Sequence, residues 1–372
     1  MMKILDDGKT KSFSLYQKPN IRENTQSPPS STFEESIKPV LKPVLTKTKE
    51  EKQPDIQSIV KNYYSPLWES FEILNSIGNG SESWVNKIIH KKTKKELSMK
   101  YIKNKEGKRN VNELKISFKL KNENIIRFLN YCCSKEDKSE IILMENAKFG
   151  NLRNFQIKSL KRSVLSETII NFMANEILKG LVFCHRNKVA HMDLKPQNIV
   201  VDDYLHAKLI DFSISINYSD KNPNDKIRLP FKGTKFYMPL EIINSKTIEC
   251  KDINKVDSYA LGVILYNLAF GCYPYGIKHE DNYDIINEKI KNNKLEFKNE
   301  NNTFSKYFID FVEKLLKKDI NERMSIYEAM NHYWLKGGNI LYDEKEKIYN
   351  IYSFTTQLIT DNIKEFNDYL RK

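Results

Sequence analysis

Two hydrophobic periodicities divide this sequence, and their order constrains the fold. From Trp68 the segments FEILNSIGNG, SWVNKIIH and KKELSMKYIK alternate apolar and polar residues with the period of two that is typical of strands, and IIRFLNYCC and EIILMEN follow as two further strand candidates. A short helix is expected between them, from about Asn110 to Lys121. After Gly150, SETIINFMANEILKGLVFCHRN and KVDSYALGVILYNLAF show long helical periodicity. The order predicts an α+β fold in which a small sheet-rich lobe precedes a larger, mainly helical lobe.

The two ends of the chain differ in composition from its centre. Residues 1–66 are rich in Ser, Thr, Pro, Lys and Gln, and they hold too little apolar surface to offset the entropy of ordering. We expect a disordered extension, in which the short repeat KPVLKPVL either docks a partner or is inert. The structured domain is predicted at 67–336, with lobes at 67–147 and 148–336. Residues 337–372 have helical periodicity and predict a tail that packs on the large lobe or binds a partner.

Composition excludes several classes of protein. The longest apolar run, ALGVILYNLAF, is too short for a membrane helix, and the N-terminus has no apolar stretch of signal-peptide length. The five cysteines lack zinc-ligand or paired spacing, so we expect reduced thiols in an intracellular protein. The net charge of +13 is spread along the whole chain, which indicates a solvated surface rather than a specific nucleic-acid site. Recruitment of an acidic partner stays open.

Several polar and glycine residues could carry chemistry, although each is weak evidence alone. Gly78 and Gly80 of IGNGSESWV stand in a strand-turn-strand setting, where glycine lets backbone amides approach a phosphate chain; a plain hairpin needs the same residues. Lys100 follows on a predicted strand. Further along come HMDLKPQN at 191–198, IDFS with Asp211, GTKFYMPLE ending in Glu241, Asp257 with Gly262, and Arg323 before HYW.

In this order and spacing the segments resemble the eukaryotic protein kinase superfamily, from about residue 71 to residue 335. The resemblance implies the bilobal protein kinase fold, ATP and Mg²⁺ as cofactors, and phosphoryl transfer to protein hydroxyls. Two alternatives remain: a pseudokinase that acts as a nucleotide-binding or scaffolding module, and a small-molecule phosphotransferase. The segment from Gly233 to Glu241 favours a protein substrate.

The resemblance implies a role for each matching polar residue. Asp193 would accept the proton of the attacking hydroxyl, and Lys195 would neutralise charge on the transferring phosphoryl group. Lys100 would hold the α- and β-phosphates of ATP. Asn198 and Asp211 would bind Mg²⁺, since a hard dication takes oxygen ligands.

The resemblance also implies the residues around the nucleotide. Glu113 is matched to the helix glutamate that pairs with Lys100, because it lies eleven residues before Asn124. Met144 matches the residue at the rear of the adenine pocket. The full set expected around ATP is Gly78, Gly80, Val85, Lys100, Glu113, Glu145, Ala147, Asn151 and Val200.

Other matched residues are expected to support the site. His191 would brace its loop and the ring of Phe212, and Asp257 would accept hydrogen bonds from backbone amides of that loop. Glu241 and Arg323 would form a buried ion pair. Removing one partner of such a pair lowers the free energy of unfolding by about 3 to 5 kcal/mol.

The sequence departs from the family pattern at several positions, none of which removes a group that would touch magnesium or phosphate. Met192 replaces an arginine that, in relatives, is neutralised by a phosphate on the segment from Asp211 to Glu241, so catalysis is expected not to need that phosphate. The other departures are Glu82 and Ser83 in the glycine turn, Ser117 on the predicted helix, Ser213 after Asp-Phe, and Pro239-Leu240 before Glu241.

Some positions that match the superfamily also indicate a substrate preference. Lys195 and the Gly233–Thr234 pair resemble the serine/threonine branch of the superfamily. Asn151 and Gln197 are amides where relatives that prefer basic peptides often carry acids. We therefore expect neutral or acidic residues around the phosphorylated one.

Overall fold

The structure is a computed structural model that describes residues 70–79, 83–103, 111–133, 139–156, 164–297 and 303–336. The predicted extension at 1–66 and tail at 337–372 lie outside these residues, as do Gly80 and Glu82 of the glycine turn. Among the helices that are described, none combines the length and the apolar character needed to span a bilayer.

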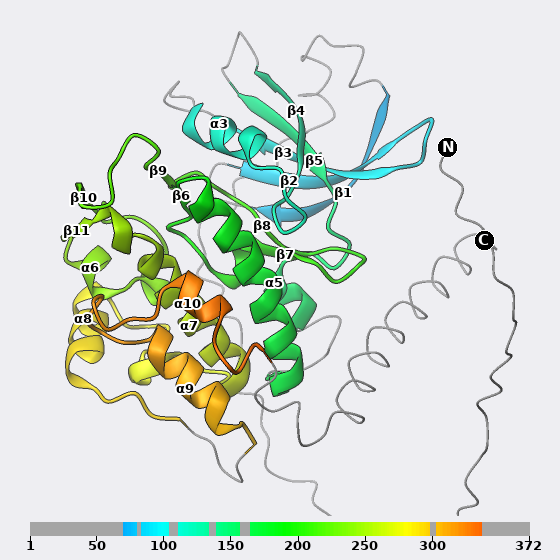
Figure 1. Ribbon diagram of the computed structural model, residues 1–372. Coiled ribbons are helices and arrows are strands. Elements are labelled where there is room, and N and C mark those ends of the chain that lie inside the picture. Colours follow the sequence, from blue (N-terminus) through cyan, green and yellow to red (C-terminus); the bar gives the residue numbers. More distant parts are fainter. Residues whose placement is uncertain are drawn as a thin grey trace, which may run out of the picture. The chain divides into compact units, whose positions relative to one another are not determined.

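Five antiparallel strands form one sheet in the spatial order β1-β2-β3-β5-β4 (Figure 1). The alternating pattern explains their formation: on β2, Trp84, Asn86 and Ile88 are buried on one face, while Val85 and Lys87 alternate with them on the other. The five predicted strands are confirmed. Their bounds are β1 Phe71–Asn79, β2 Ser83–His90, β3 Glu96–Ile102, β4 Phe128–Cys133 and β5 Glu140–Glu145.

The helix predicted at 110–121 is α3, Val111–Lys119, which lies beside this sheet (Figure 1). The ring of Phe118 meets that of Phe128 on β4 edge to face, with centroids 5.8 Å apart. Ile116 is buried in the largest apolar cluster. These contacts fix the face of α3 that carries Glu113 toward β3.

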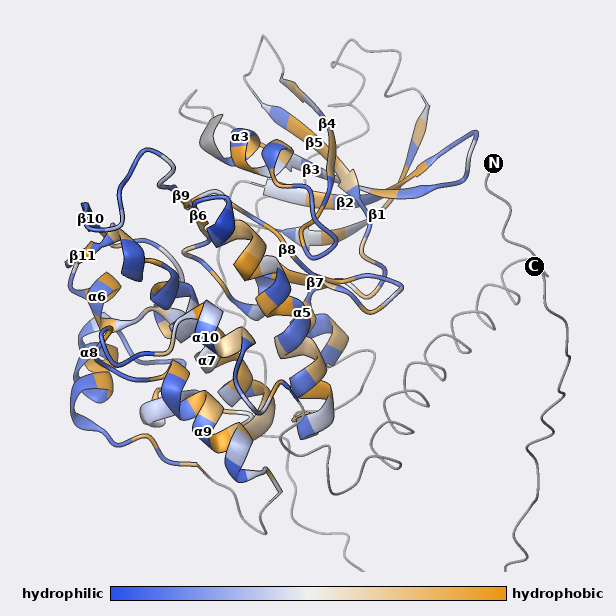
Figure 2. Ribbon diagram, viewed as in Figure 1, coloured by the Kyte–Doolittle hydropathy of each residue, from blue (hydrophilic) through white to orange (hydrophobic). Residues whose placement is uncertain are grey.

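The larger lobe is mainly helical. Its helices are α4 Leu152–Asn154, α5 Glu167–Arg186, α6 Leu240–Ile243, α7 Asn254–Phe270, α8 Tyr283–Asn292, α9 Lys306–Leu315 and α10 Ile326–Met330, with 3₁₀ turns η2 Pro196–Asn198, η3 Lys235–Tyr237, η4 Cys250–Asp252 and η5 Pro274–Gly276. The side chains of Asn282, Ser305 and Ser325 cap α8, α9 and α10 by accepting a hydrogen bond from the first turn. Figure 2 shows apolar and polar residues alternating around α5, as expected of a helix with one buried face.

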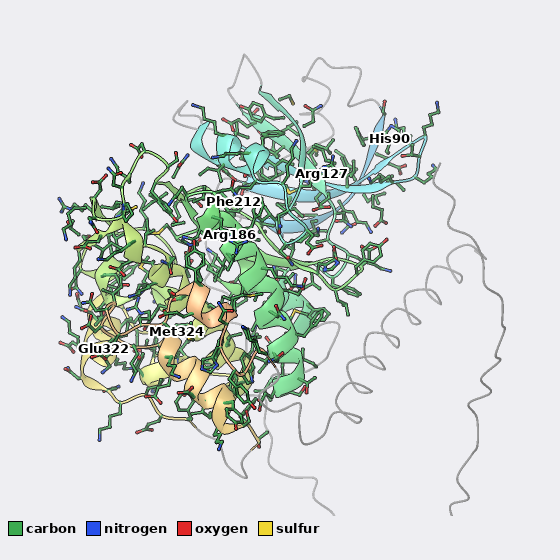
Figure 3. The ribbon with its side chains drawn as sticks, in the orientation of Figure 1. His90, Arg127, Arg186, Phe212, Glu322 and Met324 are labelled. Carbon is green, nitrogen blue, oxygen red and sulfur yellow. The ribbon has the colours of Figure 1, made fainter. Side chains whose placement is uncertain are left out.

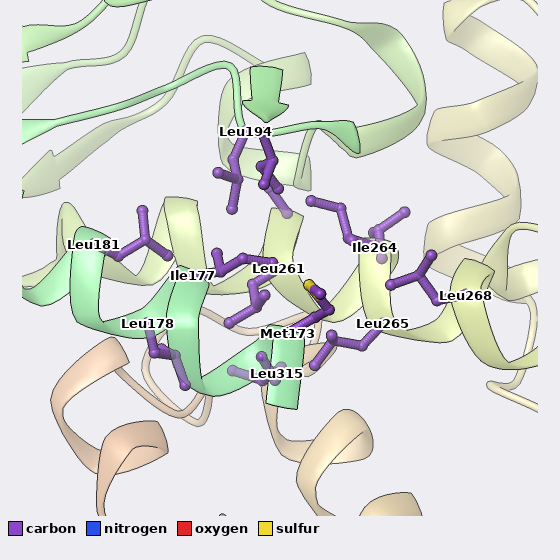
Figure 4. Close-up of a cluster of buried hydrophobic side chains, with 14 of the residues drawn as sticks. Met173, Ile177, Leu178, Leu181, Leu194, Leu261, Ile264, Leu265, Leu268 and Leu315 are labelled. Atoms are coloured by element: carbon purple, nitrogen blue, oxygen red, sulfur yellow. The ribbon is translucent and has the colours of Figure 1, made fainter. Parts of the chain in front are cut away.

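The core of this lobe forms where α5 packs against α7 (Figure 4). Met173 and Ile177 of α5 face Leu261 and Leu265 of α7, and all four are fully buried. Each such side chain contributes about 1.5 to 3 kcal/mol through burial. Gly262 lets α9 approach α7 closely, because a Cβ there would lie 2.9 Å from Cβ of Leu315.

Short strand pairs hold the loops of the larger lobe. They are β6 Val189–Ala190 with β9 Ile216–Asn217, β7 Ile199–Val201 with β8 Ala207–Leu209, and β10 Lys226–Arg228 with β11 Thr247–Glu249. Loop 191–198 runs from β6 to β7, and Asp211 follows β8 by two residues. The pairing of β7 with β8 therefore brings the two polar segments of the sequence to one place.

Candidate active site

A cavity of about 620 Å³ lies between the sheet and the helical lobe, a size that suits a nucleotide-sized ligand. Most of the residues predicted to bind a nucleotide or metal line it. They are Gly78, Val85, Lys100, Glu113, Glu145, Ala147, Asn151, Lys195, Asn198, Val200 and Asp211. Asp193 lies beside this cavity, hydrogen-bonded to three of its lining residues, Lys195, Asn198 and Thr234.

Lys100 joins the sheet to α3. Its ammonium donates to Oε1 of Glu113 at 3.0 Å and lies 3.8 Å from Oδ1 of Asp211. Burial disfavours the ammonium, but the carboxylates of Glu113 and Asp211 outweigh that effect and raise the pKa of Lys100 above its ordinary value. The cavity thus holds a cation that is charged at neutral pH.

Asp211 and Asn198 are brought together by backbone pairing. The amide of Ile210, next to Asp211, donates to the carbonyl of Asn198 at 2.9 Å. Burial disfavours the carboxylate of Asp211, yet Lys100 and the hydrogen bond from Ser213 hold its pKa below the ordinary value. The amide of Asn198 donates toward Asp193, so its carbonyl oxygen and the Asp211 carboxylate are the oxygen atoms that could bind a metal ion here.

Asp193 is held by four donors. Its Oδ2 accepts from Nζ of Lys195 at 2.7 Å and from Nδ2 of Asn198 at 3.1 Å. Its Oδ1 accepts from the amide of Thr234 at 3.0 Å and from that residue's hydroxyl at 2.8 Å. Lys195 also donates to Oγ1 of Thr234 at 2.8 Å. This carboxylate therefore has one fixed orientation, shared with a cation.

Asp257 holds the backbone of loop 191–198 in place. The buried carboxylate accepts from the amides of His191 and Met192 at 2.8 and 2.9 Å, and it lies 2.7 Å from Nε2 of His185. Met192 has a φ of 70°, a strained value for a non-glycine residue. The hydrogen bonds from Asp257 help to hold that backbone in place.

His191 packs against Phe212 with ring centroids 5.0 Å apart, and its Nε2 lies 3.0 Å from the carbonyl of Ile210 (Phe212 is labelled in Figure 3). Glu241 and Arg323 form a buried pair in which Nη2 of the guanidinium lies 3.2 Å from Oε2 of the carboxylate. None of the side chains of His191, Phe212, Glu241 and Arg323 lines the cavity, and these contacts support the loops that carry the lining residues.

Comparison with known proteins agrees with this geometry. The profile of the protein kinase domain matches residues 71–335. The chain belongs to the protein kinase family. The chain is 27% identical over 280 residues to the SNF1-related protein kinase catalytic subunit alpha KIN12 of Arabidopsis thaliana, a match that covers 73% of this chain and 53% of that protein.

Two further relatives are similar at the same level. The MAP kinase kinase MKK1/SSP32 of Saccharomyces cerevisiae is 27% identical over 337 residues, covering 82% of this chain and 63% of that protein. Myosin light chain kinase 2, skeletal/cardiac muscle, of Mus musculus is 30% identical over 251 residues, covering 67% and 37%. The chain thus spans about half to two thirds of the first two relatives and less of the third.

The kinase domain fills the space around Met192 with apolar side chains. Met192 is 7% exposed and belongs to a cluster that includes Ile227 of β10, Ile248 of β11, Leu229 and Met238. An arginine at position 192 would replace an apolar side chain of this cluster with a cation. The segment that carries β10 is instead held by apolar contact and strand pairing.

Two other departures lie in the smaller lobe. Ser83 lines the cavity from the sheet side. Ser117 is buried on α3, and its hydroxyl has no hydrogen-bond partner among the residues that the structure describes, which weakens the packing of that helix.

One lysine that joins the two lobes was not found from the sequence. Lys208 of β8 is buried, and its ammonium donates to the carbonyl of Glu123 at 2.8 Å. It also lies 3.2 Å from Oε1 of Glu145 and 3.5 Å from Oδ2 of Asp202. The signal was a lysine within the short apolar stretch AKLI, since a lysine in a buried strand needs a partner.

Proposed function

We propose that this domain transfers the γ-phosphoryl group of ATP to serine and threonine hydroxyls of proteins. The observation that carries the proposal is the meeting of two polar groups at one cavity: Lys100 with Asp211 on one side, and Asp193 with Lys195 on the other. They come from distant parts of the sequence: β3, loop 191–198 and the residues after β8. Phosphoryl transfer needs cations near the transferring group and a base near the acceptor.

The cavity supports a nucleotide site. Val85 from the sheet and Val200 from the larger lobe supply apolar surfaces on its two sides, suited to an adenine ring. Ala147 and Asn151 line the cavity where the chain passes from one lobe to the other, and Lys100 is the cation proposed for the α- and β-phosphates.

The residues also fit a magnesium ion. Asn198 and Asp211 offer an amide oxygen and a carboxylate to the same cavity, and Mg²⁺ binds through few protein oxygens while it keeps several waters. When bound, the ion would neutralise negative charge on the phosphates.

Asp193 is proposed to bind the acceptor hydroxyl. All four of its acceptor positions are filled by Lys195, Asn198 and Thr234, so a hydroxyl must replace a donor. The donors to Oδ2 are Lys195 and Asn198, the residues proposed for phosphate and metal. Asn198 would bind a metal ion through its oxygen while its nitrogen still donates to Oδ2. Contact of Lys195 with the phosphoryl group would free the position that Lys195 fills on Oδ2, which can then orient the hydroxyl and accept its proton.

A protein is favoured over a small molecule as substrate. Thr234 is bound directly to Asp193 and lies at the start of a segment that ends at Glu241, which is anchored by Arg323. This segment therefore provides a surface for a peptide beside the proposed position of the acceptor hydroxyl. A small-molecule phosphotransferase has little use for it.

The test of the proposal is a transfer assay with radiolabelled ATP, magnesium and a generic protein substrate. We expect incorporation of label by the wild type, loss of label without magnesium, and a fall of at least about 100-fold for Asp211→Asn and for Lys100→Met. Glu288→Gln, an exposed carboxylate on α8, is the matched control and should keep full activity. A wild type that binds nucleotide but transfers no phosphate would support the pseudokinase alternative instead.

A second expectation concerns phosphorylation of the segment from Asp211 to Glu241. Since Met192 lies in an apolar cluster and offers no buried cation, removal of all phosphate should change kcat/KM by less than about twofold. The measurement compares protein treated with a broad-specificity phosphatase, its mass checked, with untreated protein. A collapse of activity after treatment would contradict the expectation.

A further inference from the structure

The sheet of the smaller lobe has a second apolar face, which points away from the cavity. Val85 of β2 and Lys100 of β3 line the cavity, and side chains alternate between the two faces along each strand. The neighbours of these two residues therefore lie on the opposite face, which we call the outer face. The outer face includes Trp84, Ile88, Met99, Tyr101, Ile141 and Leu143.

The strand register makes the outer face one continuous surface. Trp84 of β2 lies opposite Tyr101 of β3, and their ring centroids are 5.7 Å apart. Tyr101 in turn lies opposite Ile141 of β5. Residues paired in this way are on the same side of an antiparallel sheet, so apolar side chains from three adjacent strands adjoin one another.

The outer face is buried, although the described elements supply no layer that covers it. Trp84 is 7% exposed, Tyr101 is 3% exposed and Ile141 is fully buried. Every described residue of this apolar cluster belongs to β1, β2, β3, β4 or β5. Helix α3 is on the cavity side, since its Glu113 accepts from Lys100. A single sheet buries a face only when a second layer packs on it.

A polar side chain on the outer face also lacks a partner. Asn86 stands between Trp84 and Ile88 on β2 and is 2% exposed. Its Nδ2 has no acceptor among the residues that the structure describes. A buried donor without an acceptor is costly, so the layer on this face is expected to bring one.

The sequence directly before β1 has the pattern of such a layer. In PDIQSIVKNYYSPLWES, residues 54–70, apolar side chains stand at positions 56, 59, 60, 63, 64, 67 and 68. This is the i, i+3, i+4, i+7 spacing of a helix with one apolar face, and Pro66 predicts the end of that helix near Ser65. The segment is an exception to the polar composition of residues 1–66.

The chain outside the described residues is tethered at the edge of the outer face. The carbonyl of Ser70 accepts from the amide of Lys91 at 2.8 Å, at the end of β2 that follows Ile88. A ten-residue helix at 56–65 is about 15 Å long, which is shorter than the roughly 25 Å of the eight residues of β2. A segment attached two residues before β1 also has a high effective concentration at this face.

We propose that residues 56–68 pack on the outer face, with an amphipathic helix at 56–65 as the second layer of the small-lobe sheet. The hydroxyl of Tyr63 or Tyr64 is the acceptor proposed for Asn86. Because β2 and β3 carry Val85 and Lys100 on their other face, this layer also holds the residues of the cavity in place. The interaction does not depend on phosphoryl transfer.

Hydrogen exchange followed by mass spectrometry tests the proposal on the full-length wild type, with no variant. We expect the amides of residues 58–65 to exchange at least about tenfold more slowly than in an unstructured chain, at every protein concentration. Exchange at the unstructured rate would overturn the proposal. Protection that depends on protein concentration would indicate a second copy as the occupant, and protection of residues 337–372 instead would indicate the C-terminal tail; both would overturn it as well.

Two substitutions of the full-length chain give a matched comparison. Ile59→Asp places a charge on the apolar side of the segment, and Ser58→Asp places the same charge on its polar side. We expect Ile59→Asp to lower Tm by about 5 °C or more and to speed exchange in β2 and β3, whereas Ser58→Asp should match the wild type. Equal effects of the two substitutions would contradict the proposed packing.

Photo-crosslinking identifies the contact even where Ile59→Asp fails to fold. p-Benzoylphenylalanine in place of Tyr63 should crosslink to peptides of β2 or β3 within the same chain. The same photoreactive residue in place of Asn62, on the polar side, should give at least about tenfold less of this product. Crosslinks of position 63 to other elements or to another chain would refute residues 56–68 as the layer on the outer face.

Discussion

Asp193→Asn is expected to lower kcat for phosphoryl transfer by about 10² to 10⁴-fold, the usual contribution of a general base. The substitution keeps the size and shape of the side chain but removes its charge and its ability to take a proton. The amide oxygen of the variant still accepts from one pair of the surrounding donors, but its nitrogen cannot accept from the other pair. Because Asp193 does not line the cavity, nucleotide affinity should be kept. The measurements are steady-state transfer to a peptide and the Kd of a fluorescent ATP analogue.

Asp203→Asn provides the matched control for this variant. Asp203 is exposed, follows β7 by two residues and does not line the cavity, so the same chemical change there should leave kcat unaltered. Transfer by Asp193→Asn at the wild-type rate would mean that Asp193 is not the base. Loss of nucleotide binding together with transfer would instead indicate a damaged fold.

Much of the fold could be predicted because its signals are local. Alternation of period two marked the five strands of the sheet, and helical periodicity marked α5 and α7 to within about two residues. The glutamate expected to meet Lys100 was placed by its distance from Asn124, and the structure has Glu113 at 3.0 Å from that lysine. The strand and helix signals depend only on neighbours along the chain, whereas the assignment of Glu113 came from the resemblance to the protein kinase superfamily.

The parts that could not be predicted depend on long-range contact. Nothing in the sequence KIR indicates that β10 pairs with β11, since the partner lies about twenty residues away and both strands are three residues long. The ion pair of Lys208 with Glu145 and the contact of Phe231 with Tyr283 could not be predicted for the same reason. The partner of a polar or aromatic residue in a short segment can be identified only when the tertiary structure is known.

Arg323→Leu is expected to lower the free energy of unfolding by about 3 to 5 kcal/mol, because it leaves a buried carboxylate without its cation. Arg323 is 1% exposed, and besides Glu241 its guanidinium donates to the carbonyls of Lys317, Lys255 and Lys318 at 2.8, 3.0 and 3.3 Å. All of these acceptors lose a donor at once. Chemical denaturation followed by tryptophan fluorescence measures the change.

Two comparisons decide whether the buried pair causes this loss. Lys317→Met breaks the exposed pair with Glu313, whose side chains are 39% and 51% exposed, and should cost less than about 1 kcal/mol. In the background of Arg323→Leu, adding Glu241→Leu should cost little or restore stability, since the carboxylate is by then buried and unpaired. The double variant could instead lose as much stability as the single variants Arg323→Leu and Glu241→Leu lose together. In that case the ion pair would not be the source of the stability, and the backbone hydrogen bonds of Arg323 would have to account for it.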